Sequence, residues 1–156
     1  ALSVLAVGLT GYLSFRNGQR AVNDVAHQLR SEVSARIQDH LQTFFKTPLQ
    51  INQSNADILC RGVIATGDAP ALERHFWEQI HVFKTVSSIY FGNTSGGLVD
   101  AGREGPEGSL YVISTDGFVR GPFKKYSTDS QGQRTGLLVT VPNFDARTRP
   151  WYIKAV

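Results

Sequence analysis

The hydrophobic positions divide the chain into parts with different periodicities. Residues 1–15 (ALSVLAVGLTGYLSF) contain no charge, and Arg16 ends this run. From residue 21 the apolar residues recur every three or four positions, which is typical of one face of a helix. After Val86 the apolar residues form short β-rich runs separated by turn residues. The pattern therefore predicts an α+β fold, with a long N-terminal helix followed by a sheet.

Residues 16–62 are predicted to form a long amphipathic stalk helix. We expect Pro48 to kink or split it, because proline removes a backbone donor and clashes with the preceding turn. The pattern continues to Gly62, beyond the length of ordinary globular helices. The apolar stripe consists of Val22, Val25, Ala26, Leu29, Val33, Ile37, Leu41, Phe44, Phe45 and Leu49.

Residues 63–156 are predicted to form a single module, which begins with a helix over roughly 71–84. Asp68 is a candidate N-cap for this helix. Glycine-containing turns separate the later β-rich runs, and no helix lies between them, so the sheet should be antiparallel. A short helix is expected over 147–155. The helix should bury Leu72, Phe76, Ile80 and Phe83, and the strands should lie at 87–92, 98–103, 109–115, 118–126 and 136–141.

The uncharged residues 1–15 are interpreted as the outer part of a transmembrane helix. A full span needs about 20 apolar residues, and the chain contains no methionine, so further residues are expected upstream. Two alternatives are a signal-peptide core cleaved near Ala6-Val7-Gly8 and a buried globular helix. The helical pattern that continues downstream favours the membrane anchor. Arg16 and Arg20 do not settle the orientation, because the upstream flank is not visible.

Charge and motif content argue against several classes of function. Sixteen Lys and Arg against thirteen Asp and Glu give a net charge of +3, and the basic residues are scattered, which argues against nucleic-acid binding. Cys60 is alone, so it has no intrachain disulfide partner. The four histidines form no HExxH pair, and neither a GxSxG elbow nor the lysine of a P-loop is present. We expect no metal, no cofactor and no enzymatic activity.

The segment from Asn143 to Tyr152 (NFDARTRPWY) combines two arginines with three aromatic residues between a strand and a helix. Arginine presents a planar fork suited to a carboxylate, and aromatic faces suit a cation or an apolar group. These are the parts of a pocket for a small zwitterion or organic acid. We assign ligand contact to Arg149 and Trp151. A structural role, with local pairing of Asp145 and Arg147, is assigned to Asp145, Arg147 and Pro150.

DARTRPWY, with the β-rich runs and the long helix before it, resembles the DxRxRPWY signature of double Cache sensor domains of bacterial transmembrane receptors. Residues 88–93 (SIYFGN) are similar to the first strand and hairpin of their membrane-distal module. The resemblance spans essentially the whole chain and implies a PAS-like sheet flanked by helices. It also implies that the module is incomplete at the C-terminus, with further strands, a membrane-proximal module and a second transmembrane helix beyond Val156.

In amino-acid-binding members of this family, an arginine and a tryptophan contact the ligand carboxylate. Arg149 and Trp151 match them, and Tyr152 matches the aromatic residue that follows. Phe144 stands where such members have a tyrosine, five residues before the arginine. Their ammonium-binding aspartate lies downstream of Val156, so the resemblance does not decide between an amino acid and another organic acid.

The expected function is therefore extracytoplasmic sensing in a receptor of the plasma (inner) membrane. The ligand would be an amino acid or organic acid, and the cytoplasmic output a histidine kinase, an adenylate, guanylate or diguanylate cyclase, or a chemoreceptor tip. The long helix is expected to pair with a second copy in a homodimer. The alternative is a structural or dimerisation domain of the envelope that binds no ligand.

Overall fold

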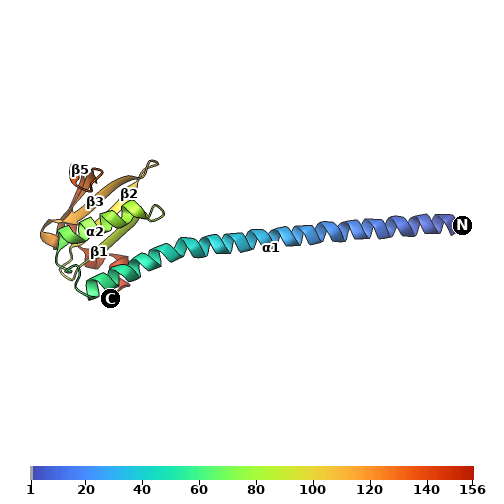
Figure 1. Ribbon diagram of the computed structural model, residues 1–156, viewed down its shortest axis with the longest axis horizontal. Coiled ribbons are helices and arrows are strands. Elements are labelled where there is room, and N and C mark those ends of the chain that lie inside the picture. The colour runs from blue at the N-terminus through green and yellow to red at the C-terminus, as the bar shows by residue number, and fades with distance from the viewer. Residues whose placement is uncertain (1) are drawn as a thin grey trace. The chain divides into compact units, whose positions relative to one another are not determined.

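The computed structural model describes residues 2–156, with side chains from Val7 onward, so the start of the expected membrane segment at Ala1 lies outside the described residues. The long helix and the antiparallel sheet confirm the predicted α+β fold (Figure 1). The helices are α1 (Leu2–Cys60), α2 (Ala69–Val82) and α3 (Pro150–Ile153), and the strands are β1 (Ser88–Gly92), β2 (Leu98–Glu104), β3 (Ser109–Thr115), β4 (Gly121–Thr128) and β5 (Arg134–Phe144). Two short 3-10 turns, η1 (Asp116–Phe118) and η2 (Ala146–Thr148), complete the described elements.

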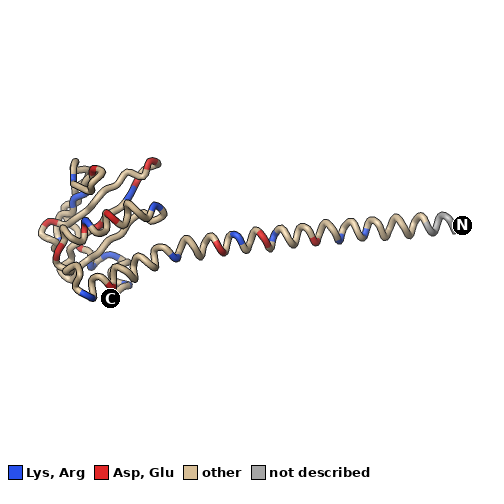
Figure 2. Tube along the Cα trace, in the orientation of Figure 1, with Lys and Arg blue, Asp and Glu red and all other residues tan. Residues whose placement is uncertain are grey.

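The chain divides into two compact units, residues 1–45 and residues 46–156. The first unit consists of the N-terminal part of α1, along which acidic and basic residues are interspersed (Figure 2). Its apolar stripe is exposed to solvent: Val22, Val25, Leu29, Val33, Ile37, Leu41 and Phe44. Within the described residues, no helix combines the length and the apolar character that crossing a membrane requires.

Helix α1 continues through Pro48, so the expectation that this proline splits the helix is wrong. Twelve residues beyond Pro48 remain helical, up to Cys60. Within the second unit, Ile51 is buried and Leu59 packs against the same core cluster. Burying these side chains offsets the backbone hydrogen bond that proline removes.

The second unit is built on a five-stranded antiparallel meander in the order β1-β2-β3-β4-β5, as the turn residues predicted. Helix α2 lies across one face of this sheet (Figure 1). Asp68 caps the helix as predicted, since its side chain accepts a hydrogen bond from the backbone N–H of Ala71 at 3.1 Å. The core between α2 and the sheet includes Leu72, Phe76, Trp77, Ile80, Val99, Ala101 and Val112.

Several predicted boundaries were wrong. Phe83, expected in the core, is exposed because α2 ends at Val82 and Phe83 takes the C-cap position. The expected strand at 118–126 begins only at Gly121, after η1. The single helix expected over 147–155 is instead η2 followed by α3. Arg149 between them is extended (φ −86°, ψ 140°), as the steric demand of the following proline favours.

The opposite face of the sheet carries a second, smaller apolar cluster. Val99 packs under α2, and its neighbour Leu98 points to the other side, as alternation along a strand requires. There Leu98 packs with Phe144 and Ala146, and the rings of Trp151 and Tyr152 lie against them. The C-terminal motif is therefore anchored on the face that α2 leaves open.

Candidate functional site

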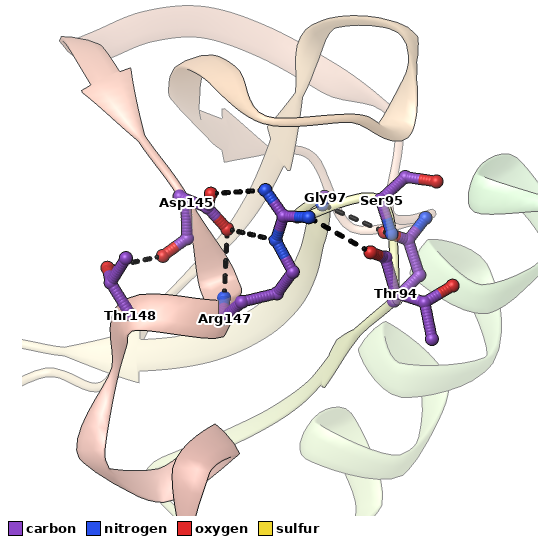
Figure 3. A network of polar contacts seen from close by, with 7 residues as sticks. Thr94, Ser95, Gly97, Asp145, Arg147 and Thr148 are labelled. Carbon is purple, nitrogen blue, oxygen red and sulfur yellow. Dashed lines mark hydrogen bonds and ion pairs between the residues drawn. The ribbon is translucent and has the colours of Figure 1, made fainter.

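The C-terminal motif is organised by an ion pair between Asp145 and Arg147 (Figure 3). Asp145 Oδ1 accepts hydrogen bonds from the backbone N of Arg147 at 3.0 Å and from its Nε at 2.9 Å. Asp145 Oδ2 accepts from Nη2 of the same arginine at 2.6 Å. These hydrogen bonds from Arg147 lower the pKa of the Asp145 carboxyl to about 2. Both residues, to which the sequence assigned a structural role, thus fix the start of η2.

The same pair docks the motif onto the turn between β1 and β2 (Figure 3). Arg147 Nη1 donates to the carbonyl oxygen of Thr94 at 3.4 Å, and the backbone N of Ala146 donates to that of Gly96 at 3.0 Å. Gly96 has a φ of 82°, and a Cβ at this position would lie 2.5 Å from Asp145 Oδ1. A glycine is therefore required where the carboxylate meets the turn.

A third segment, from the end of η1 to the start of β4, meets the same turn. Asn93 Nδ2 donates to the carbonyl oxygen of Phe118 at 2.7 Å, and its Oδ1 accepts from the backbone N of Gly97 at 2.8 Å. The backbone N of Arg120 donates to the carbonyl oxygen of Ser95 at 2.9 Å. Three segments that are distant in sequence are thereby held together by backbone hydrogen bonds.

An open hollow lies where these segments meet. Arg149 stands at its edge with an exposed side chain, and its guanidinium carbon lies 4.6 Å from the centre of the Phe144 ring. Phe144 itself is buried and packs edge-on against Phe123 at 5.2 Å. The hollow is lined by Arg120, Gly121, Asn143, Phe144, Asp145, Thr148 and Arg149. Its lining is mainly polar, with one aromatic wall.

Trp151, which was assigned ligand contact together with Arg149, lies in the aromatic packing beside the hollow. The Trp151 ring lies 4.8 Å from the ring of Tyr90 on β1, and Tyr152 packs edge-on against Trp151 at 5.8 Å. Neither Trp151 nor Tyr152 lines the hollow. Pro150 occupies the first turn of α3. Of the four predicted ligand contacts, Arg149 and Phe144 line the hollow, whereas Trp151 and Tyr152 form the packing beside it.

Sequence reasoning missed Arg120, Asn143 and Thr148 as parts of this site. Asn143 and Thr148 belong to the arginine-rich segment 143–152, whereas Arg120 falls inside the strand predicted over 118–126. No local sequence pattern connects Arg120 to Arg149. Both line one hollow because the β1–β2 turn accepts hydrogen bonds from the segments that carry them.

A second polar cluster that the sequence did not reveal lies on the sheet. Asp100 on β2 is buried, and Ser88 Oγ donates a hydrogen bond to its Oδ1 at 2.7 Å. Burial raises the pKa of the Asp100 carboxyl to about 6, against the smaller opposing effects of Ser88 and Lys125. The Tyr111 ring lies beside it with Lys125 Nζ 3.9 Å from its centre, and burial likewise raises the pKa of the Tyr111 hydroxyl.

The histidines on α2 have other partners. His75 Nε2 lies 2.9 Å from Asn55 Oδ1 on α1, and His81 stacks on Trp77. Burial lowers the pKa of His75. In the part of the chain that the structure describes, no three His, Cys, Asp or Glu side chains gather in a way that would hold a metal ion.

Comparison with known proteins found no family model, no curated protein and no solved structure that matches this chain. Its function is therefore inferred from its own residues.

Proposed function

We propose that the chain is the extracytoplasmic ligand-sensing part of a membrane-bound signal-transduction receptor, which binds a small polar metabolite such as an amino acid or a carboxylate. The observation that carries this proposal is Arg149 at the edge of the polar hollow. Its guanidinium rests on the Phe144 ring and takes part in none of the ion pairs found among the described residues. Such a group is available to an incoming anion.

The surroundings of Arg149 suit ligand binding. A guanidinium pairs with a carboxylate through two parallel hydrogen bonds, which a lysine does not reproduce. The loop that carries Arg149 is held by the Asp145–Arg147 pair and by the β1–β2 turn, so its backbone is fixed before a ligand arrives. Binding residues on loops positioned by a rigid scaffold are a common arrangement. The resemblance of DARTRPWY to the Cache signature points to the same residue.

A route from the sheet to α1 exists inside the second unit. Ile51 of α1 packs in the core shared by α2 and the sheet, and Asn55 exchanges hydrogen bonds with Gln79 of α2 at 2.8 and 2.9 Å. A ligand that favours one arrangement of the sheet would shift the population of α1 positions by its differential affinity. In the receptor, residues 1–15 would lie in the membrane, and the output would be a kinase, a cyclase or a chemoreceptor tip.

A structural or dimerisation domain is the second candidate. The observation that favours it is the exposed apolar stripe of α1 from Val22 to Phe44, which suits pairing with another helix. Both functions use the stripe, but only a sensor needs the hollow. The dependence of ligand binding on Arg149 therefore discriminates between them.

The test is calorimetric titration of the full chain with ligands found by a thermal-shift screen of amino acids and organic acids. Arg149→Ala should weaken binding by more than about tenfold while the melting temperature stays close to that of the wild type. Arg147→Ala is the matched control, because it should lower stability through Asp145 and leave the affinity of the folded protein nearly unchanged. If Arg149→Ala binds as tightly as the wild type, or fails to fold, the ligand-contact role is wrong.

A further inference from the structure

We propose that the hollow binds a small dianion. Arg149 would pair with one acidic group of this ligand, and the guanidinium of Arg120 would pair with the other. The inference rests on the proposed function and adds the chemical class of the ligand, which would be a dicarboxylate or a phosphate. Arg120 is the residue that this inference adds to the site.

The charge of the hollow is the first support. Arg120 and Arg149 line it together with one carboxylate, that of Asp145. Arg147 already occupies both oxygens of this carboxylate, at 2.6 and 2.9 Å. Neither Arg120 nor Arg149 takes part in any ion pair among the described residues. Because Arg147 neutralises this carboxylate, Arg120 and Arg149 leave the hollow with an excess of positive charge, which favours an anion with more than one negative charge.

The position of Arg120 is the second support, because the fold holds its backbone in place. The backbone N of Arg120 donates to the carbonyl oxygen of Ser95 at 2.9 Å. A Cβ added at Gly96 would lie 3.0 Å from the Cβ of Arg120, so the two backbones lie close together. The backbone N of Arg149 donates to the carbonyl oxygen of Ala146 at 3.1 Å. Both arginines are thus anchored through the main chain at one hollow, while their exposed guanidinium groups remain available.

The other lining residues fit the same ligand. Asn143 offers an amide that donates hydrogen bonds, and the Phe144 ring forms an apolar wall for a short carbon chain. Thr148 Oγ1 donates to the carbonyl oxygen of Asp145 at 2.9 Å, which ties this side chain to the loop. Two arginines and the amide donor of Asn143 together suit a ligand with two acidic groups.

The experiment is calorimetric titration of the full chain at low ionic strength with succinate, inorganic phosphate and the monoanion butyrate. The wild type should bind succinate or phosphate at least about tenfold more tightly than butyrate. Arg120→Gln should remove this preference and change butyrate binding by less than about threefold, whereas Arg149→Gln should weaken binding of all three anions. Arg120→Lys, which keeps the charge, should retain part of the preference. Arg74→Gln is the control, because this exposed arginine pairs with Glu78 on α2.

The remaining outcomes separate the inference from the function on which it rests. Tighter binding of phosphate or of succinate shows whether the natural ligand is a phosphate or a dicarboxylate. If Arg120→Gln keeps the wild-type preference while Arg149→Gln weakens all binding, the dianion inference is wrong and the sensing function stands. If an amino acid binds through Arg149 more tightly than any dianion, the inference is also wrong. Binding of no probe, or binding that is indifferent to Arg149, contradicts both.

Discussion

The indole ring of Trp77 on α2 lies against Gly132 in the β4–β5 hairpin, where a Cβ would come within 2.7 Å of the ring. Trp77 Nε1 also donates a hydrogen bond to Thr128 Oγ1 at 2.9 Å. On the same side, Arg134 pairs with Glu73 of α2. The hairpin farthest along the sheet from β1 is thereby attached to the helix that covers the sheet.

Gly132→Ala should destabilise the chain by more than backbone strain alone. Gly132 and Gly105 have similar φ angles, 80° and 73°, but a Cβ at Gly105 meets no atom within 4 Å. Gly105→Ala should therefore cost about 1–2 kcal/mol through strain. Gly132→Ala should cost about 1–3 kcal/mol more, because the Trp77 ring must move. Chemical denaturation of both variants measures the difference, and equal losses of stability would show that the contact with Trp77 is loose.

Asp100→Asn should change how stability depends on pH. Burial raises the pKa of Asp100 from 3.8 to about 6, so between about pH 4 and pH 6 the unfolded state loses its proton first. The wild-type free energy of unfolding should fall across this range as pH rises and remain low above it. The asparagine variant avoids this loss and should be more stable at pH 8 by about 2–3 kcal/mol. If the free energies of unfolding of the two proteins run parallel from pH 4 to pH 8, the raised pKa of Asp100 is wrong.

Asp145→Asn should change the pH dependence of stability in the opposite direction to Asp100→Asn. Arg147 lowers the pKa of Asp145 from 3.8 to about 2, so the ionised carboxylate stabilises the fold fully above about pH 4. That stabilisation should disappear as pH falls toward 2. The variant should therefore melt below the wild type at pH 7, and the two melting temperatures should converge near pH 2. A difference in melting temperature that persists unchanged down to pH 2 would argue against the ion pair as its source.

The apolar stripe of α1 should face a second copy of the chain. In a Cys60→Ser background, Val33→Cys places a thiol on the stripe, and Ser31→Cys places one on the opposite side of the helix, about 160° away. Mild oxidation in detergent should yield disulfide-linked dimers of the Val33→Cys protein and few of the Ser31→Cys protein. Equal cross-linking at the two positions would exclude a defined helix pair.

Local signals predicted much of the architecture. The three-to-four spacing after residue 21, the Asp68 cap and the glycine-containing turns between the β-rich runs each depend on neighbouring residues, and each corresponds to an observed feature. Trp77 was missed because it lies beside the predicted Leu72–Phe76–Ile80 stripe, and its burial depends on the β4–β5 hairpin. Pro48 does not split the helix, because packing of Ile51 outweighs the local cost of proline.

For the site, the residues 143–152 carried a local signal, since two arginines and three aromatic residues fall in ten positions. Which of them share a hollow was decided by the tertiary structure. Arg147 reaches Thr94, 53 residues away, and Arg120 meets the same turn through Ser95, so a hollow with two arginines forms from three separate segments. The sequence by itself determined the long helix, the second helix, the antiparallel order of the strands and the arginine-rich motif, because periodicity and turn chemistry act over a few residues. Only the tertiary structure placed Arg120 and Arg149 at one hollow and buried Asp100, because both arrangements depend on contacts between residues far apart in the chain.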